Sequence, residues 1–413
     1  MENVDPVGVH TGDSIVVAPT LTLSDEAVTM LHDSAIRLIR ALNIKGGCNV
    51  QFALDPNSLA YYLIEVNPRL SRSSALASKA SAYPIARVAA KIAVGLNLEE
   101  ILVAGQPASF EPQLDYIVAK LPRFAFDKFE GADKALSTQM KATGEVMSLG
   151  RDFGEALLKG VRSLEVGASY LYLPRFDHWE EKDLLDYVKT PTDDCIFAIA
   201  ALFRLGVTVE AIHERTAITA YFLEEIKKLV DGEKLIEEAD LDENKLRELK
   251  TLGYSDAFIA KKLGKKVEDI IRLRQNYGIF PAYDRVDTAE TTFPEPVPYF
   301  YSTYKHSAGD ILEEAHPESK GRVLVLGSGP IRIGQGVEFD YSTVHAVQTL
   351  QAMGYEAILI NNNPETVSTD YTTADRLYFE PLTLEDVMNV IEREKPLGVI
   401  VSLGGQTAIN LSQ

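Results

Sequence analysis

The sequence has little positive charge, few cysteines and no long apolar run, and each shortage excludes a class of protein. Lysine and arginine number 41 against 60 aspartate and glutamate residues, so the formal net charge is −19. Such a chain repels nucleic acids and anionic membrane surfaces. The two cysteines, Cys48 and Cys195, lie far apart and offer neither a disulfide framework nor a zinc-binding spacing. We therefore expect a protein of the reducing cytoplasm that binds neither nucleic acid nor membrane.

The N-terminus and the hydropathy pattern exclude further classes. Residues 1–5 lack the basic and apolar regions of a secretory signal, and no stretch is long and apolar enough to span a bilayer. At 413 residues with 46% hydrophobic residues, the chain is long enough for about three domains with real cores.

The pattern along the chain predicts three parts. Residues 1–168 mix helix and strand, residues 169–318 are mostly helical in their middle, and residues 319–413 alternate strand and helix in a way that predicts a parallel sheet. The individual elements that we expect are a helix N-capped by Ser24 with Val28 on its apolar stripe, two helices separated at Pro84, a strand over residues 116–124, a helix start at Thr190-Pro191, helical runs over residues 196–205, 212–229 and 246–252, and a linker over residues 280–298.

Two neighbouring segments carry the clearest chemical signal. Asn49 and Gln51 alternate with apolar residues in one segment, and Glu65 and Asn67 do so in the next. Residues 55–58 (Asp-Pro-Asn-Ser) between them predict a turn. A hairpin centred near residue 58 would place Gln51 opposite Glu65 and Asn49 opposite Asn67, about 5 Å apart.

A carboxylate with carboxamide oxygens suits a hard cation such as Mg²⁺ or Mn²⁺. One carboxylate cannot neutralise the metal, so a nucleotide phosphate would complete the site. Arg69 and Arg72 follow the hairpin and supply donors for a small oxyanion or a transferring phosphoryl group. The alternative is a solvated hairpin face without a ligand.

Longer motifs resemble a known family. Gln51 followed by Glu65-x-Asn-Pro-Arg is similar to the metal strands of ATP-grasp ligases. Residues 72–80 (Arg-Ser-Ser-Ala-Leu-Ala-Ser-Lys-Ala) and 8–14 (Gly-Val-His-Thr-Gly-Asp-Ser) resemble the first, carboxyphosphate-forming half of the large subunit of carbamoyl-phosphate synthase. The motifs that resemble the opening of its second half lie at residues 327–336, 338–341, 363–371 and 404–407.

This resemblance implies a fold class of α/β and α: the C-terminal lobe of an ATP-grasp module over residues 1–168, a helical oligomerisation domain over residues 169–318, and a Rossmann-like pre-ATP-grasp domain over residues 319–413. The family makes carbamoyl phosphate from bicarbonate, glutamine-derived ammonia and two ATP, through carboxyphosphate and carbamate. The implied partners are a glutamine amidotransferase small subunit and further copies bound through the helical domain. The pathway served, whether arginine biosynthesis, pyrimidine biosynthesis or both, stays open.

The resemblance assigns the site residues by position. The residues that would bind Mg²⁺ or Mn²⁺ are Gln51, Glu65 and Asn67. The residues that would contact ATP are Gly8, Val9, His10, Gln51 and Glu65. The residues that would hold bicarbonate or the phosphoryl group are Asn49, Arg69 and Arg72. The residues that would help to bind K⁺ are Asn3, Asp5 and Ser14.

In the family, further lobes precede the first of these segments and follow the last. We therefore expect the 413-residue chain alone not to turn over. Two alternatives remain for the whole chain, namely another ATP-grasp carboxylase or ligase, and a non-catalytic oligomerisation module.

Two local patterns suggest other ligands. Residues 327–336 could bind a dinucleotide, but Arg332 stands where that fingerprint has glycine, and no acidic residue follows the next strand. Residues 255–271 have the cadence of a DNA-binding helix-turn-helix with four lysines; a tight pair of packed helices agrees better with the acidic chain.

Overall fold

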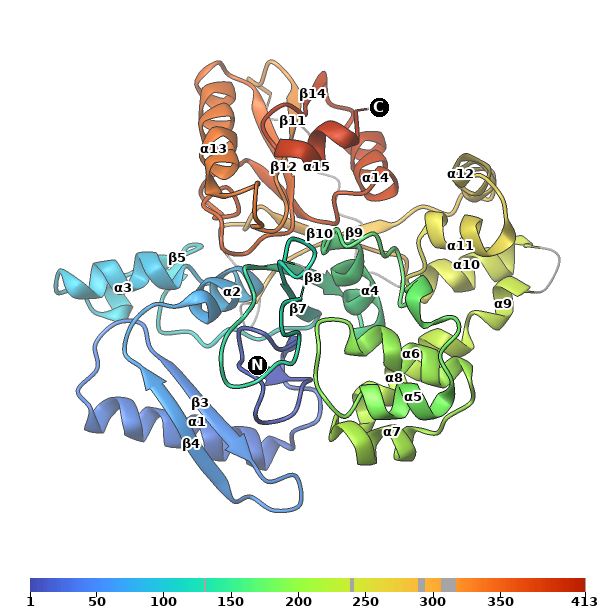
Figure 1. Ribbon diagram of the computed structural model, residues 1–413. Coiled ribbons are helices and arrows are strands. Elements are labelled where there is room, and N and C mark those ends of the chain that lie inside the picture. The colour runs from blue at the N-terminus through green and yellow to red at the C-terminus, as the bar shows by residue number, and fades with distance from the viewer. Residues whose placement is uncertain (130, 238–240, 289–293, 306–316, 413) are drawn as a thin grey trace. The chain divides into compact units, whose positions relative to one another are not determined.

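The computed structural model describes residues 1–129, 131–237, 241–288, 294–305 and 317–412 (Figure 1). The chain forms two compact units, and each is described by itself. The first comprises Met1–Glu2, Ala18–Asp115 and Val286–Val297, and the second comprises Asn3–Val17, Tyr116–Arg285 and Pro298–Gln413. The division into residues 1–168, 169–318 and 319–413 stays a prediction.

The first unit contains a long helix, a two-stranded hairpin and two shorter helices. The Ser24 hydroxyl accepts a hydrogen bond from the Ala27 N–H (3.2 Å), which confirms the predicted N-cap of α1. The predicted apolar stripe is partly wrong, because Val28 is 40% exposed while Ala27 and Ser34 are buried. The elements are α1 (Asp25–Ala41), β3 (Asn49–Leu54), β4 (Tyr61–Asn67), α2 (Arg72–Ser81), α3 (Ile85–Ala93), η1 (Leu98–Glu100), β5 (Leu102–Val103) and β6 (Gln106–Pro107).

A four-stranded sheet has the order β1 (Glu2–Asn3), β2 (Val16–Ala18), β7 (Ile117–Arg123) and β8 (Gly144–Gly150). Helix α4 (Phe153–Ser163) packs against β7 and β8, and all its residues except Arg162 are buried. Neither β8 nor α4 was expected from the sequence.

The predicted helical middle is confirmed within the second unit, although two details are wrong. The run over residues 212–229 is two helices, because Ala217 ends the first of them in a left-handed conformation (φ 56°). Thr190-Pro191 lies in a loop, and the next helix begins at Cys195. The elements are η2 (Pro174–Phe176), α5 (Glu181–Tyr187), α6 (Cys195–Arg204), α7 (Val209–Thr216), α8 (Ala220–Asp231), α9 (Lys234–Glu237), α10 (Glu243–Thr251), α11 (Asp256–Leu263) and α12 (Val267–Asn276).

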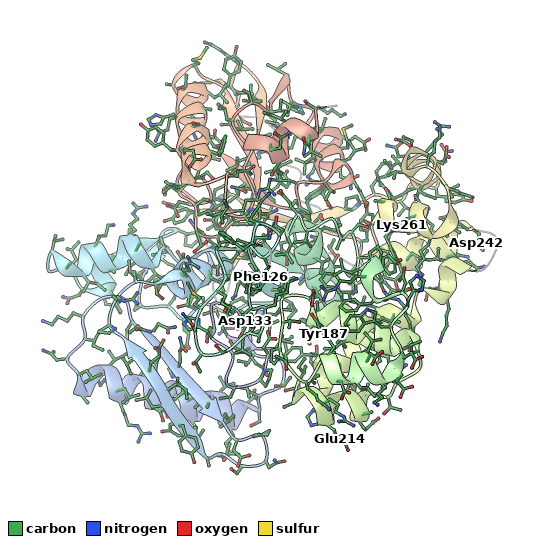
Figure 2. The ribbon with its side chains drawn as sticks, viewed as in Figure 1. Phe126, Asp133, Tyr187, Glu214, Asp242 and Lys261 are labelled. Carbon is green, nitrogen blue, oxygen red and sulfur yellow. The ribbon has the colours of Figure 1, made fainter. Side chains whose placement is uncertain are left out.

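Residues 255–271 form the tight pair of packed helices, α11 and α12, that the sequence favoured over a DNA reader. Two of the four lysines of this segment have side-chain partners within the unit. Lys262 Nζ lies 2.7 Å from Glu233 Oε2, and Lys261, labelled in Figure 2, lies over the ring of Tyr172 at 4.7 Å.

A six-stranded sheet completes the second unit, in the order β14-β11-β12-β13-β10-β9. All neighbouring pairs are parallel except β9 and β10, so the predicted parallel sheet is confirmed. The predicted linker over residues 280–298 is wrong at Ala282–Arg285, which forms the edge strand β9; residues 289–293 lie outside the described residues. The elements are β9 (Ala282–Arg285), β10 (Tyr299–Thr303), β11 (Arg322–Leu326), α13 (Val337–Ala352), β12 (Glu356–Asn361), β13 (Arg376–Phe379), α14 (Leu384–Glu394), β14 (Gly398–Ile400) and α15 (Gly405–Asn410).

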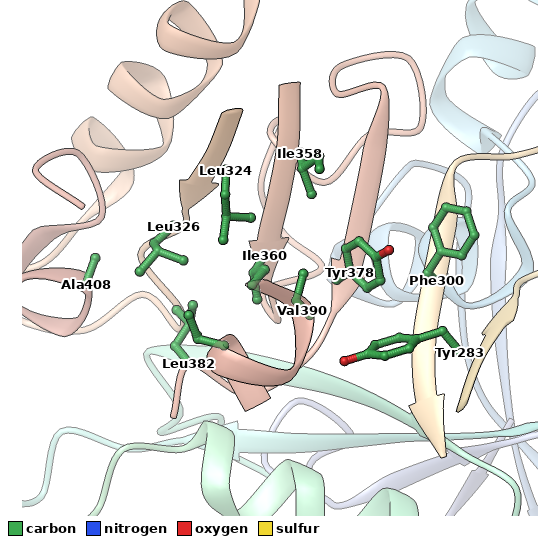
Figure 3. Packing of buried hydrophobic residues seen from close by; sticks show 11 residues of the cluster. Tyr283, Phe300, Leu324, Leu326, Ile358, Ile360, Tyr378, Leu382, Val390 and Ala408 are labelled. Atoms are coloured by element: carbon green, nitrogen blue, oxygen red, sulfur yellow. The ribbon is translucent and has the colours of Figure 1, made fainter. Parts of the chain in front are cut away.

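The core of this sheet is a cluster of buried aliphatic and aromatic side chains (Figure 3). Leu324 and Leu326 of β11 and Ile358 and Ile360 of β12 are fully or almost fully buried, and Ala408 of α15 belongs to the same cluster. The central strands are therefore fixed by packing on one face, which also fixes where the loops at their carboxyl ends begin.

The loop before α15 passes very close to the loop after β11. An ideal Cβ on Gly404 would lie 2.4 Å from the carbonyl oxygen of Gly327 and 2.7 Å from that of Leu326. Since backbone cannot yield as a flexible side chain does, we expect Gly404→Ala to lower the free energy of unfolding by about 1–3 kcal/mol. Gly398→Ala is the matched control, because a Cβ there meets nothing within 4 Å, and it should change stability little. Urea unfolding of both variants measures the difference, and equal stability would contradict the close approach.

Candidate functional site

The hairpin of β3 and β4 brings the predicted polar side chains together. Gln51 pairs with Glu65, and Asn49 pairs with Asn67, which confirms the predicted register. Because paired residues of an antiparallel ladder share a face, all four side chains lie on one side of the ribbon. The opposite side carries Phe52 and Tyr61, whose rings lie edge to face at 5.4 Å.

A β-bulge interrupts the ladder directly after the polar pairs. Phe52 pairs with Leu63 and Ala53 with Tyr62, so one residue of β4 is extra at this point. Strict alternation along residues 61–67 of the sequence predicts Tyr62 on the apolar side with Ile64 and Val66, and this prediction is wrong. The bulge puts Tyr62 on the same side as Gln51, and its side chain is 74% exposed. The sequence does not indicate the bulge, because residues 61–64 (Tyr-Tyr-Leu-Ile) are all aromatic or aliphatic and so do not mark the face that each occupies.

The polar side chains of this face are hydrogen-bonded in pairs along each strand. Asn67 Nδ2 donates to Glu65 Oε1 at 2.7 Å, and Gln51 Nε2 donates to Asn49 Oδ1 at 3.3 Å. Glu65 is exposed and the other three are half-buried, so the face is open to a ligand. One carboxylate and three carboxamide oxygens fit Mg²⁺ or Mn²⁺, provided that an anionic ligand such as a phosphate shares the metal.

Nowhere among the described residues do three or more His, Cys, Asp or Glu side chains gather as a metal-binding group. A site on the hairpin would combine its single carboxylate with amide oxygens and with the ligand itself.

The two arginines lie just past the hairpin. Arg69 is exposed, and its Nη1 donates to the carbonyl oxygen of Leu70 at 3.0 Å. Arg72 is the exposed first residue of α2. Arg69 retains further donors in its guanidinium fork, so neither position conflicts with binding of an oxyanion.

The segment predicted to contact nucleotide lies in the second unit. Gly8 has φ 113°, a conformation that favours glycine, and Val9 is buried. His10 Nδ1 accepts the Gly12 N–H at 2.9 Å, so this ring nitrogen holds the loop and leaves Nε2 for a ligand. The buried ammonium of Lys120 donates to the carbonyl oxygens of Thr11 (2.9 Å) and Gly12.

The residues predicted to help bind K⁺ lie in the same segment. Asn3 Nδ2 donates to Thr11 Oγ1 at 3.4 Å, and the Ser14 hydroxyl donates to the His10 carbonyl oxygen at 3.2 Å. Asp5 accepts the Ile15 N–H at 2.7 Å, and burial raises its pKa to about 6 despite that bond. Each of the three side chains thus has a structural hydrogen bond, and their role toward K⁺ stays a prediction.

A small cavity of about 50 Å³ lies under this segment in the second unit. Its lining is mostly apolar, from β7, α4, α6 and α8, but Asp5, Asp13 and Asp193 also border it. Burial and the neighbouring Asp194 raise the pKa of Asp193 to about 6, although Lys134 and Arg175 oppose the rise.

This shift predicts a pH dependence with a definite sign. Since the folded-state pKa of Asp193 lies above the ordinary 3.8, its contribution to stability is full below pH 4 and is lost as the pH rises through 6. Asp193→Asn should therefore raise the free energy of unfolding at pH 7 by about 1–2 kcal/mol and reduce its fall between pH 4 and 6. A slope remains, because Asp5 titrates in the same direction.

Urea unfolding between pH 4 and pH 7 measures the effect. Asp186→Asn is the control, because the hydrogen bond from Lys189 lowers the pKa of Asp186. The contribution of Asp186 to stability therefore changes with pH in the opposite direction. A pH profile of Asp193→Asn that matches the unmutated protein would contradict the raised pKa.

The contacts of the glycine-rich loop after β11 argue against a dinucleotide site. Asn361 fills the space beside it, because a Cβ on Gly327 would lie 2.4 Å from Asn361 Cγ, and Asn361 Oδ1 accepts the Gly329 N–H at 3.1 Å. The carboxylate of Asp340 accepts the Val367 N–H at 2.9 Å and thereby holds the start of α13. These contacts support the sequence-based argument against a nicotinamide cofactor.

Comparison with protein families now adds to this geometry. Residues 1–101 match the carbamoyl-phosphate synthase L chain ATP-binding domain, and residues 145–278 match the oligomerisation domain of the carbamoyl-phosphate synthetase large chain. Residues 319–413 match the carbamoyl phosphate synthase preATP-grasp domain. The chain belongs to the carbamoyl-phosphate synthase large-chain family.

Membership explains the arrangement of the chain. An ATP-binding segment, a helical oligomerisation segment and a parallel-sheet preATP-grasp segment follow one another, as the fold requires. The family is one of ATP-dependent ligases, and the matched ATP-binding and oligomerisation domains support ATP use and self-association. No described helix has the length and apolar character needed to cross a membrane.

Proposed function

We propose that the hairpin face binds a divalent metal together with the phosphates of ATP, in the step that phosphorylates bicarbonate. Gln51 and Glu65 are the ligands of metal and nucleotide, and Asn67 completes the metal set. The bound Mg²⁺ or Mn²⁺ would neutralise phosphate charge during transfer. The observation that carries the proposal is the register that sets Gln51 against Glu65 and Asn49 against Asn67.

The other residues orient the reacting groups. Asn49, Arg69 and Arg72 hold bicarbonate or the transferring phosphoryl group with forked, charge-assisted hydrogen bonds. Gly8, Val9 and His10 contact the nucleotide, and Asn3, Asp5 and Ser14 help to bind K⁺. The matched ATP-binding domain, which covers all of these residues, supports these roles.

In the reaction that we propose, ATP transfers its γ-phosphoryl group to bicarbonate to give carboxyphosphate and ADP. Ammonia then displaces phosphate to give carbamate, and a second ATP phosphorylates carbamate to carbamoyl phosphate. Ammonia comes from glutamine through a separate amidotransferase subunit, in the cytoplasm, for arginine or pyrimidine synthesis. The matched preATP-grasp segment supports a second phosphorylating half.

Calorimetry of the purified 413-residue chain with ATP and Mg²⁺ tests the binding part of the proposal. We expect heat of binding that requires both metal and nucleotide, since neither alone completes the donor set. Undetectable binding would instead favour a non-catalytic oligomerisation module. The expectation that the chain alone does not turn over stays a prediction, which bicarbonate-dependent ATP hydrolysis by the purified chain would contradict.

A further inference from the structure

The six-stranded sheet has a switch point where its fold would be expected to bind a ligand. In the sheet, β12 lies beside β11 on one side, and β14 lies beside β11 on the other side. In open parallel sheets, ligands bind outside the carboxyl ends of the strands at such a point. Two loops with glycines meet there, residues 327–336 after β11 and residues 401–404 after β14.

Two side chains of the loop after β11 and one of α15 lie in this crevice. Arg332 Nη2 donates to Gln335 Oε1 and to Thr407 Oγ1, each at 3.1 Å. Gln335 Nε2 also donates to Thr407 Oγ1, at 3.0 Å. The threonine hydroxyl thus accepts two hydrogen bonds, and its single proton is free to be donated to a third partner.

That partner is Glu165, from the segment that follows α4. Its Oε2 accepts from Thr407 Oγ1 at 2.8 Å and from Arg332 Nη1 at 2.5 Å. An ideal Cβ on Gly329 would lie 2.7 Å from the other carboxylate oxygen, so glycine leaves the space that the carboxylate uses. A glycine loop, a guanidinium and a hydroxyl form the usual surroundings of a bound anion. In this crevice the anion is the protein's own side chain.

Polar contacts attach helix α4 and the segment that follows it to the end of β10, to the segment after β13, to α14 and to the glycine-rich loop. Charged side chains occur three or four residues apart along one face of α4 and just past its C-terminal end. They are Glu155, Lys159, Arg162 and Glu165. Their partners are, in the same order, Thr303 (3.1 Å), Glu380 (3.1 Å), Asp386 (3.4 Å) and Arg332 (2.5 Å). The carboxylate of Glu165 is the last of these attachments and the one that reaches the glycine-rich loop.

We propose that Glu165 is a built-in anionic ligand of the switch-point crevice, which positions Arg332 and fastens the glycine-rich loop to the end of α4. Glu165 belongs to the matched oligomerisation segment and Arg332 to the matched preATP-grasp segment, so this contact couples the two. The crevice itself is a site for a planar carboxylate-type anion. Tethering gives Glu165 a high effective concentration, so free anions do not displace it. The inference is independent of the nucleotide chemistry proposed for the hairpin.

Removal of the carboxylate should turn the crevice into a site for a free anion. In Glu165→Ala, we expect a lower melting temperature that sodium formate raises as its concentration increases, relative to sodium chloride at equal ionic strength. The unmutated protein and Glu165→Ala/Arg332→Met should show no such formate-specific rise. Glu214→Ala, an exposed glutamate on α7 labelled in Figure 2, is the matched control and should behave as the unmutated protein.

Hydrogen exchange gives a second, local readout. Amides of residues 327–336 should exchange about tenfold faster in Glu165→Ala, as loss of a charged hydrogen bond implies, and formate should slow them again. An equal formate response in all variants, or unchanged loop exchange, would overturn the proposal. If Glu165→Ala does not fold, Glu165→Gln keeps the side-chain shape without the charge; unchanged loop exchange in that variant would equally refute it.

Discussion

Replacing Glu65 by glutamine should lower the affinity of the chain for manganese–ATP by at least about tenfold, because it removes the one carboxylate of the hairpin face. Calorimetric titration with Mn²⁺ and ATP measures the loss. Glu65 is exposed, so the free energy of unfolding should change by no more than about 0.5 kcal/mol. A loss of binding without a loss of stability would assign the effect to the site.

Glu99→Gln is the matched control, an exposed glutamate of the same unit outside the hairpin. It should bind manganese–ATP as the unmutated chain does. In a complete synthase that carries this segment, Glu65→Gln should abolish bicarbonate-dependent ATP hydrolysis with the fold intact. Retained hydrolysis would refute the metal role of Glu65.

Replacing Lys250 by methionine should lower the free energy of unfolding by about 3–5 kcal/mol, the largest effect on stability that we expect. Lys250 is buried at the end of α10, where its ammonium lies 3.0 Å from Asp256 Oδ1 and 2.5 Å from Glu385 Oε1. Burial alone would raise the pKa of Glu385, but Lys250 and Arg162 bring it below its usual value. Without Lys250, both carboxylates lose a buried partner.

A double-mutant cycle separates this charge effect from lost packing. Lys250→Met/Glu385→Gln removes one charge of each sign and keeps an oxygen that can accept the Asp256 N–H, so it should recover part of the lost stability. Lys228→Met, at an exposed position on α8, is the control and should have little effect. Additive losses in the double variant, measured by urea unfolding, would show that the pair is not coupled.

The hairpin could be predicted from the sequence because its signal is local. Alternation of polar and apolar residues on both sides of a turn is enough to set Gln51 against Glu65. The β-bulge at the next pair could not be predicted, since residues 61–64 are all aromatic or aliphatic and do not mark the face that each occupies. For the same reason, the sequence pattern does not predict that Tyr62 lies on the same side as Gln51.

Helix α4 was missed for a different reason. Residues at Glu155, Lys159 and Arg162 have the spacing of a solvated helix face, yet all three are mostly buried against oppositely charged or polar groups far along the chain. The spacing of charged residues along a helix does not show whether that face contacts water or complementary groups of the protein. Glu165 and Arg332 are 167 residues apart, so only the tertiary fold reveals that they meet.

The helix boundaries show the same division between local and tertiary causes. Ser24 was a correct N-cap because its hydroxyl bonds an N–H three residues on. Thr190-Pro191 was a wrong helix start because the Pro191 carbonyl oxygen instead accepts the N–H of Leu136, a contact made by the fold. Strand β9 is likewise absent from the sequence pattern, since it pairs only at the edge of a sheet whose other strands come later in the chain.

Anomalous diffraction from crystals soaked with Mn²⁺ and a non-hydrolysable ATP analogue would locate the metal directly. A single manganese peak should lie at coordination distance, about 2.0–2.3 Å, from oxygens of both Glu65 and Gln51, with a phosphate oxygen of the analogue on the same ion. A manganese–nucleotide peak elsewhere in the chain, with the hairpin face unchanged, would contradict the assignment of this hairpin as the metal site.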